Sequence, residues 1–201
     1  MADHYYTQNP TSAHDERMIK AEVLGNLLTF VTDAGVFSKD GVDSGTRLLV
    51  EALPELTGRV LDLGCGWGAV GVSLGRKYPE IEIVMTDINE RAAELSRKNL
   101  RANGVKNAVV VTGDAFASVE GKFSAVITNP PIRAGKQVIY GMFETAKEYL
   151  EDGGCLYIVI RKQQGAPSAI KFLSGIYADV EVIDRGGGFW VIRACKGGEN
   201  A

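Results

Sequence analysis

The chain has 201 residues, 45% of them apolar, with a formal net charge of −3 and a sequence pI of about 5.5. This length and apolar content suit one domain with a full hydrophobic core. The acidic balance excludes a global positive field that would hold nucleic acid nonspecifically, so a nucleic-acid partner needs a local basic patch. No apolar run approaches the roughly 20 residues of a membrane span, and residues 1–20 lack the apolar centre of a signal peptide. We therefore expect no membrane partner.

The polar start of the chain predicts an irregular arm followed by a β-hairpin outside the main sheet. Residues 1–16 are polar and form the arm. Two apolar-rich runs within residues 18–32 flank Gly25-Asn26, a two-residue connection that favours a hairpin turn. The histidines, His4 and His14, both fall in the arm, where we expect solvated surface.

A loop that carries an apolar Phe37 leads from the hairpin into the main part of the chain. Asp43 and Ser44 are candidate N-caps for an amphipathic helix over residues 46–53. We therefore divide the chain into an N-terminal arm and hairpin extension, residues 1–43, and a main domain, residues 44–201.

The main domain begins with an apolar run that breaks into alternating glycines. Residues 60–63 suit a buried parallel strand, and residues 69–77 suit a helix. Between them Gly64, Gly66 and Gly68 permit positive φ angles and let the backbone approach a ligand with no Cβ in the way. This loop predicts a site for a nucleotide-like cofactor.

Strands and helices alternate beyond the glycine loop, which predicts a parallel sheet. Strands are predicted over residues 81–86, 108–112, 123–128, 155–160, 180–183 and 189–194, and helices over 90–103, 137–150 and 166–174. The last two strands should pair antiparallel, because only a short glycine-rich turn separates them. The expected fold is α/β and Rossmann-like, with seven strands that are mostly parallel, one antiparallel strand near the C-terminus, and the N-terminal β-hairpin.

The three cysteines lie far apart in apolar or glycine-rich sequence. Cys65, Cys155 and Cys195 are odd in number and lack the paired spacing of zinc ligands. We predict that all three are reduced core thiols, that the protein binds no metal and that it is cytoplasmic.

The glycine loop also satisfies a dinucleotide-binding fingerprint. Gly64, Gly66 and Ala69 match its pattern, and Asp87 ends the next strand at about the spacing of a ribose-binding acid. A carboxylate offers two acceptor oxygens to the two hydroxyl donors of a ribose diol. A nicotinamide-dependent oxidoreductase is therefore one reading of these residues.

Two further strand ends favour another cofactor. Asp114 follows the third strand and can accept from an adenine amino group, while the Ala115 N–H can reach the ring. The fourth strand ends in Asn129-Pro130-Pro131-Ile132, in the crevice where open α/β sheets bind ligands. The function of a nicotinamide-dependent oxidoreductase does not account for this tetrapeptide.

Taken together, these motifs resemble those of a class I S-adenosylmethionine-dependent methyltransferase: Asp62-Leu63-Gly64-Cys65-Gly66, Asp87, Asp114 and Asn129-Pro130-Pro131-Ile132. More narrowly, the chain resembles the small-subunit ribosomal RNA guanine-N2 methyltransferase family in its short bacterial form. That likeness is carried by His4-Tyr5-Tyr6, residues 30–33, residues 35–38 with Asp43, and residues 129–136. Longer members have an additional N-terminal domain. Many Asn-Pro-Pro enzymes also have an aromatic residue where this chain has Ile132.

The resemblance implies S-adenosyl-L-methionine as the cofactor and assigns roles to particular residues. Asp62 and the glycine loop hold the methionine part, Asp87 the ribose, Asp114 and Ala115 the adenine, and Phe37 walls the pocket. The implied cofactor residues are Phe37, Asp62, Gly64, Gly66, Asp87, Ile88, Asp114, Ala115 and Asn129. Asn129 and Pro130 are the implied catalytic pair, and Pro131, Ile132, Arg133 and Lys136 the implied substrate-binding residues.

The Asn-Pro-Pro motif suits methyl transfer to an exocyclic amino nitrogen, whose lone pair is delocalised into its ring. The Asn129 side-chain oxygen and the Pro130 carbonyl can each accept one N–H. These bonds aim the lone pair and stabilise the positive charge that develops on nitrogen. No strong general base is required, which agrees with the lack of histidine in the motifs.

The expected partner is ribosomal RNA or the small ribosomal subunit, with the target guanine unpaired or flipped out of a duplex. Arg133, Lys136 and the pair Arg161-Lys162 are candidate phosphate contacts. The residues leave three alternatives open. One is methylation of adenine N6 or a protein glutamine amide, which present a similar planar NH2; the second is a nicotinamide oxidoreductase; and the third is a noncatalytic RNA-binding module.

Overall fold

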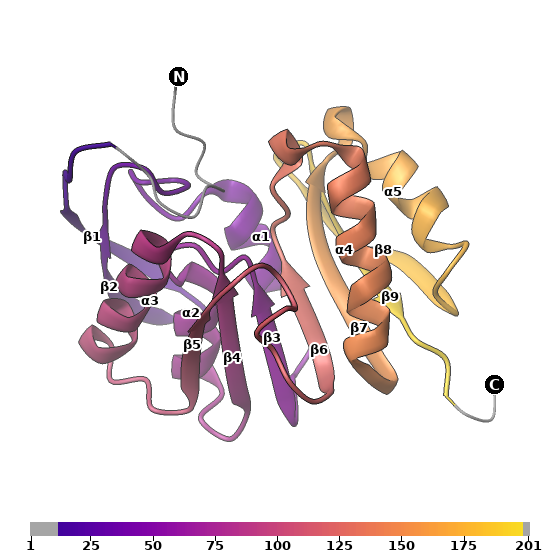
Figure 1. Cartoon of the computed structure of the whole chain (residues 1–201), viewed down its shortest axis with the longest axis horizontal. Helices are drawn as coiled ribbons and strands as arrows, with labels where there is room; N and C mark the ends of the chain where they lie inside the picture. Colours follow the sequence, from indigo (N-terminus) through magenta and orange to yellow (C-terminus); the bar gives the residue numbers. More distant parts are fainter. Residues whose placement is uncertain (1–11, 199–201) are drawn as a thin grey trace.

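A seven-stranded sheet forms the centre of the molecule (Figure 1). Its strands are β3 (Arg59–Leu63), β4 (Glu82–Asp87), β5 (Ala108–Thr112), β6 (Phe123–Thr128), β7 (Leu150–Arg161), β8 (Asp179–Gly186) and β9 (Phe189–Cys195). The computed structural model describes residues 12–198. The strand order is β5-β4-β3-β6-β7-β9-β8, and β9 alone runs antiparallel to the other six strands. The predicted fold class is therefore confirmed.

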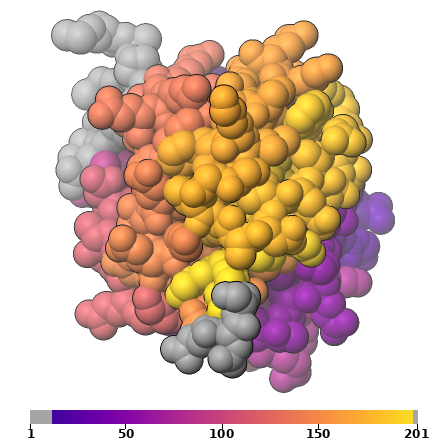
Figure 2. Space-filling view, turned by 90° about the vertical axis from the view of Figure 1, so that its right-hand side faces the viewer, coloured from indigo at the N-terminus to yellow at the C-terminus, as the bar shows by residue number. Residues whose placement is uncertain are grey.

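Helices cover both faces of the sheet, which accounts for the continuous apolar character of the parallel strands. The helices are α1 (Ser44–Ala52), α2 (Ala69–Lys77), α3 (Glu90–Ala102), α4 (Lys136–Tyr149) and α5 (Ala166–Leu173), with short 3-10 turns η1 (Ile132–Ala134) and η2 (Lys162–Gln164). Side chains alternate between two cores, so that Val60 packs on the α1 to α3 side and Leu61 on the α4 and α5 side. Seen from the edge of the sheet where β8 lies, the orange and yellow C-terminal elements face the viewer (Figure 2).

The N-terminal hairpin forms a separate two-stranded antiparallel sheet of β1 (Arg17–Val23) and β2 (Asn26–Thr32), as predicted. Its turn lies one residue earlier than expected, at Leu24 and Gly25, whose φ angles are 51° and 75°. Asn26 instead opens β2, and its Nδ2 donates to the Leu24 carbonyl at 3.2 Å. Asn26 thus supports the turn from the first position of the strand.

Two asparagine side chains cover the outer edge of β2. Asn99 lies within α3, and Asn103 is the C-cap of that helix. Asn99 Oδ1 accepts the Val31 N–H at 2.7 Å, and Asn103 Oδ1 accepts the Thr29 N–H at 3.0 Å. Each amide nitrogen donates back to the carbonyl of the same β2 residue. Asn99 Nδ2 also donates to the Trp67 carbonyl at 2.7 Å, so it ties the hairpin to the glycine loop.

Strand β7 begins five residues before the predicted start at residue 155. Its first residues include two carboxylates and two glycines, which have low β propensity. The strand forms here because this segment pairs with β6, where Leu150 lies opposite Phe123. The register of this pairing shifts between Phe123 and Ala125 of β6. Gly154 is required at this irregularity because a Cβ there would lie 3.0 Å from the Phe123 carbonyl oxygen.

Cys155 and Cys195 form a disulfide, so the prediction that all three cysteines are reduced core thiols is wrong. They are 40 residues apart in sequence but lie directly opposite each other on β7 and β9, with Cα atoms 4.0 Å apart. Spacing along the chain cannot reveal this pair because antiparallel pairing creates it. Cys65 is a buried free thiol. The cytoplasmic location was predicted from three reduced cysteines, and the disulfide removes that argument.

The described structure begins inside the predicted arm, so the expectations for residues 1–11, including His4, lie outside the described residues. The His14 side chain is 71% exposed, in keeping with a surface position. It is not simply solvated, since its Nδ1 lies 2.5 Å from Oδ2 of the buried Asp33.

Two kinds of feature are absent from residues 12–198. None of the helices in this part of the chain has the length and apolar character needed to cross a membrane. Within the same range, histidine, cysteine and carboxylate side chains form no group of three or more that could hold a metal ion.

Candidate active site

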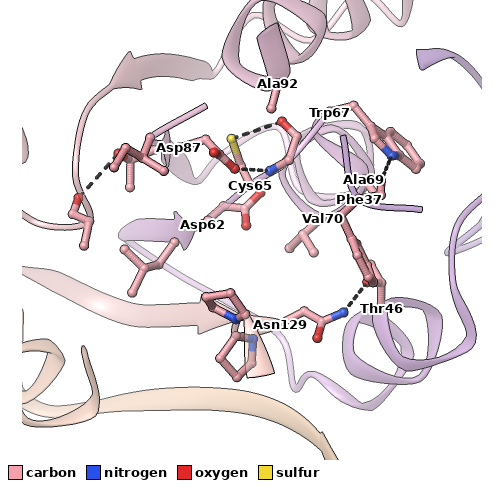
Figure 3. A pocket seen from close by; sticks show the side chains of 18 of the residues that line it. Phe37, Thr46, Asp62, Cys65, Trp67, Ala69, Val70, Asp87, Ala92 and Asn129 are labelled. Carbon is pink, nitrogen blue, oxygen red and sulfur yellow. Dashed lines mark hydrogen bonds between the residues drawn. The ribbon is translucent and has the colours of Figure 1, made fainter. Parts of the chain in front are cut away.

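A pocket lies at the carboxyl ends of β3, β4 and β6, where the strand order reverses direction. Figure 3 shows Asp62, Asp87 and Asn129 around this hollow. Eleven predicted site residues line it: Phe37, Asp62, Gly64, Gly66, Asp87, Ile88, Asp114, Ala115, Asn129, Pro130 and Pro131. Three predicted substrate residues do not line it. Ile132 packs against the core on the α4 side, while Arg133 and Lys136 are exposed.

The backbone of the glycine loop faces the pocket without side chains to cover it. Gly64 and Gly66 have φ angles of 72° and 57°, and a Cβ at either position would meet no protein atom within 4 Å. The loop is fixed from behind, since the Gly64 N–H donates to the Thr86 carbonyl at 2.8 Å. The Gly66 N–H donates to Asp87 Oδ2 at 2.7 Å. Its open side can therefore receive a ligand without rearrangement.

Two carboxylates lie at the base of the pocket. Asp62 is 2% exposed. Its pKa is raised to about 7, chiefly by burial and to a smaller extent by the charge of Asp87, against the opposing effect of the hydrogen bond from the Gly71 N–H. Burial also raises the pKa of Asp87, and hydrogen bonds from the Asn89 and Gly66 N–H groups oppose that rise. A ligand that brings positive charge into this pocket favours the ionised carboxylates.

The Asn129 amide is oriented by a short chain of hydrogen bonds from α1. Its Nδ2 donates to Thr46 Oγ1 at 3.0 Å (Figure 3). The Thr46 hydroxyl in turn donates to Asp43, the residue that caps α1 by accepting from the Gly45 and Thr46 N–H groups. Because the amide nitrogen is engaged with Thr46, the side-chain oxygen of Asn129 remains to accept a hydrogen bond from a ligand.

Two segments that line the pocket have non-glycine residues in the left-handed region. Ser38 and Ala115 have φ angles of 52° and 46°. Such conformations persist only where surrounding contacts hold them, and they are common at ligand sites. The loop of Ser38 is held by Trp67, whose Nε1 donates to the Phe37 carbonyl at 2.9 Å. Trp67 is 3% exposed and packs edge-on against Phe30, so it supports the loop from the core.

Sequence reasoning missed Thr46 and an apolar wall on α4. Val138 and Met142 line the pocket and lie four residues apart, so they share one helix face. Val138 is 51% exposed, and Phe37, another lining residue, is 40% exposed. In the sequence, two apolar residues four positions apart shortly after the Asn-Pro-Pro motif are the signal that could have found this wall.

The glycine loop, the strand-end carboxylate and the Asn-Pro-Pro amide thus converge on one pocket at the switch point of the sheet. With this strand order, the combination defines a class I S-adenosylmethionine-dependent methyltransferase. A family model described as the methyltransferase small domain matches residues 27–193. The chain belongs to that family.

The chain is also similar to individual proteins in sequence and in structure. The uncharacterized protein YbxB of Bacillus subtilis strain 168 is 42% identical over 200 residues, which cover 98% of this chain and 100% of that protein. The ribosomal RNA small subunit methyltransferase C of Escherichia coli K12 is 38% identical over 83% of this chain and 49% of its own length. The T. thermophilus 16S rRNA N2 G1207 methyltransferase, solved with AdoMet and guanosine, has a TM-score of 0.81 at 28% identity, covering 93% of this chain and 52% of that one. The chain spans about half the length of these two enzymes.

The pocket fits S-adenosylmethionine. Its glycine positions are open where a Cβ would intrude, and the buried carboxylate of Asp62 suits a positive charge of the cofactor. The match to the family favours this cofactor over a nicotinamide.

The raised pKa of Asp62 predicts a pH-dependent affinity for the cofactor. Below about 7 the free carboxyl is protonated, whereas a bound ammonium group favours its ionised form, so binding releases a proton. Affinity should therefore rise with pH and level off above that value. Calorimetry with S-adenosylhomocysteine should give a Kd about tenfold weaker at pH 6 than at pH 8. Asp62→Asn keeps the acceptor for Gly71 and should remove the pH dependence; equal wild-type affinities at both pH values contradict this linkage.

The contact between Thr46 and Asn129 predicts a positioning role for Thr46. Thr46→Val preserves the side-chain shape but removes the acceptor for Asn129 Nδ2. We expect kcat to fall about tenfold, the effect of roughly one hydrogen bond, while the Kd for S-adenosylhomocysteine stays unchanged. Thr46→Ser retains the hydroxyl and should restore most of kcat. Wild-type turnover by the valine variant is the contrary result.

Proposed function

We propose that this chain transfers the methyl group of S-adenosylmethionine to the exocyclic N2 of a guanine in small-subunit ribosomal RNA. The observation that carries the proposal is the orientation of Asn129, whose amide nitrogen donates to Thr46 while its oxygen remains available at the pocket. An amino group bound there meets an acceptor rather than a competing donor.

The chain's own residues suffice to activate such a nucleophile. S-adenosylmethionine supplies an activated methyl group whose leaving group departs neutral. Asn129 Oδ1 and the Pro130 carbonyl accept the two N–H groups of the substrate and thereby orient the nitrogen lone pair. The same bonds stabilise positive charge as it develops on nitrogen. The apolar wall of Val138 and Met142 offers contact to a flat ring at one side of the pocket.

The choice of guanine in ribosomal RNA is supported by the relatives. The E. coli protein is named for the small ribosomal subunit and the T. thermophilus protein for N2 of a 16S rRNA guanine. The acceptor geometry by itself suits any planar NH2 group, including adenine N6 and a glutamine amide. A ribosomal substrate also assigns the protein to the compartment that holds ribosomes, the cytoplasm in a bacterium.

Mass mapping of small-subunit ribosomal RNA from cells with and without the protein tests the proposal. We expect one N2-methylguanine to disappear from the second sample and to return when the purified protein and labelled cofactor are added to the unmodified subunit. An unchanged guanine pattern overturns the RNA assignment. Label found in ribosomal protein identifies a glutamine acceptor instead, and RNA binding without any label identifies a noncatalytic module.

A further inference from the structure

Basic side chains gather at the carboxyl edge of the sheet although the chain is acidic overall. Five exposed residues form what we term the cationic edge: Arg133, Lys136, Arg161, Lys162 and Arg185. They lie on η1, at the start of α4, at the end of β7, on η2 and near the end of β8. Asp184 is the one acid in residues 129–136, 161–165 and 184–190. The local charge is therefore opposite in sign to that of the whole protein.

Arginines of the cationic edge also differ in their partners from other arginines. Seven of the eleven form ion pairs with carboxylates: Arg17, Arg47, Arg59, Arg91, Arg97, Arg101 and Arg193. The other four form none with any residue from 12 to 198: Arg76, Arg133, Arg161 and Arg185. Three of these four belong to the cationic edge. Without a carboxylate partner, their guanidinium groups can bind phosphate in bidentate geometry.

The guanidinium group of Arg161 and the aromatic ring beneath it form what we term the platform. The Cζ atom of Arg161 lies 4.1 Å from the centroid of the Phe189 ring, and the two residues lie opposite each other on β7 and β9. One side of the guanidinium thus faces the ring. Because Arg161 is exposed, its other side is accessible to a ligand. Unpaired RNA bases stack on guanidinium planes of this kind.

This platform is connected to the catalytic amide through the first turn of α1. Gly45 packs so tightly on Phe189 that a Cβ there would lie 2.7 Å from the ring atom Cε1. The next residue, Thr46, accepts the hydrogen bond from Asn129. Phe189 and Asn129 therefore contact adjacent residues of one helix turn, which fixes the platform at the side of the pocket.

We propose that the Arg161 and Phe189 pair is a stacking platform for a nucleobase that neighbours the target guanine, and that the cationic edge binds the phosphates of the same RNA strand. The inference rests on the proposed function, because it takes RNA as the substrate. A single-stranded or flipped-out segment fits both parts: its bases are free to stack, and its phosphates supply the negative charge that this edge lacks.

Binding of purified small-subunit ribosomal RNA, measured over a series of salt concentrations, separates stacking from charge. Arg161→Ala should weaken binding about tenfold, within the range known for one stacked base. Arg161→Lys keeps the charge but not the plane, so it should lose most of the same affinity with an unchanged salt slope. Lys136→Glu should weaken binding and lower the slope of log Kd against log salt by about 0.7 for each phosphate that the variant no longer binds.

Arg76→Ala is the matched control, because Arg76 is also an arginine without an ion pair but lies near the C-terminus of α2, away from this edge. It should bind RNA as the wild type does, and all variants should keep the wild-type Kd for S-adenosylhomocysteine. Phe189→Leu provides a second test that retains apolar packing on Gly45 while removing the ring under Arg161.

The outcomes distinguish failure of the platform proposal from failure of the proposed function on which it depends. Wild-type RNA affinity in Arg161→Ala, or in both Arg161→Lys and Phe189→Leu, overturns the platform while methylation of RNA by the wild type still supports the proposed function. Failure of the wild type to bind or methylate ribosomal RNA overturns both.

Discussion

Asn129→Ala is expected to lower kcat by at least ~100-fold, the typical effect of removing one preorganised hydrogen-bonding group from a transition state. The variant loses the side-chain oxygen that accepts the substrate N–H and also the donor to Thr46. The carboxylates and glycine loop that face the cofactor remain in place. The Kd for S-adenosylhomocysteine should therefore stay within about threefold of wild type, since the missing hydrogen bond acts on the developing charge.

Single-turnover transfer of labelled methyl and calorimetry measure the two quantities separately. Asn129→Gln is an informative companion because it carries the same amide one methylene further out. If the role of Asn129 depends on its position, the glutamine variant should recover little of the wild-type rate, since a displacement of about 1 Å can cost ~100-fold. Turnover of Asn129→Ala close to wild type contradicts the assigned role.

Asp87→Ala should weaken cofactor binding about 100-fold, which corresponds to roughly 2.7 kcal/mol or one to two charge-assisted hydrogen bonds. In the structure its Oδ1 accepts from the Asn89 N–H at 2.8 Å and its Oδ2 from the Gly66 N–H at 2.7 Å. Alanine removes the acceptors proposed for the ribose and also the acceptor that holds the Gly66 N–H of the glycine loop. Both effects act on binding before any chemistry occurs.

Calorimetry with S-adenosylhomocysteine measures this decrease in affinity, and Glu82→Ala is its control. Glu82 is the first residue of β4, as Asp87 is the last, and it pairs with Arg59 at the surface far from the pocket. The control should bind as the wild type does. Asp87→Asn keeps one acceptor oxygen and should lie between the two. An affinity of Asp87→Ala within threefold of wild type contradicts the role of this carboxylate.

Elements with strong local signals were predictable from the sequence. Strands β5 and β6 match their predicted bounds residue for residue, as does helix α2, because apolar or β-branched runs end there in glycine, asparagine or proline. The Asn89 cap of α3 agrees with its residue type, since asparagine is among the residues preferred at helix N-caps. By contrast, the early start of β7 depends on a pairing with β6 that overrides poor local propensity.

The site was predictable where it consists of strand ends and not where it depends on contacts between distant segments. Parallel strands bring their carboxyl ends together, so the amino-acid sequence alone allowed Asp62, Asp87 and Asn129 to be grouped. Thr46 is 83 residues from Asn129, and Phe189 meets Gly45 from the far end of the chain. Such contacts are set by how α1 packs on the sheet, for which no periodicity or motif gives a signal.

The two asparagines that cover β2 determine where the chain can be shortened. A protein that began at residue 44 would leave the amide of Asn99, which is fully buried, without its partners on Val31. Removal of the hairpin would also uncover apolar surface of α2 and α3, the helices that β2 contacts in the core that contains Phe30. Such a fragment would present an apolar surface prone to aggregation. The hairpin is therefore part of the smallest unit of this chain that should remain folded in solution.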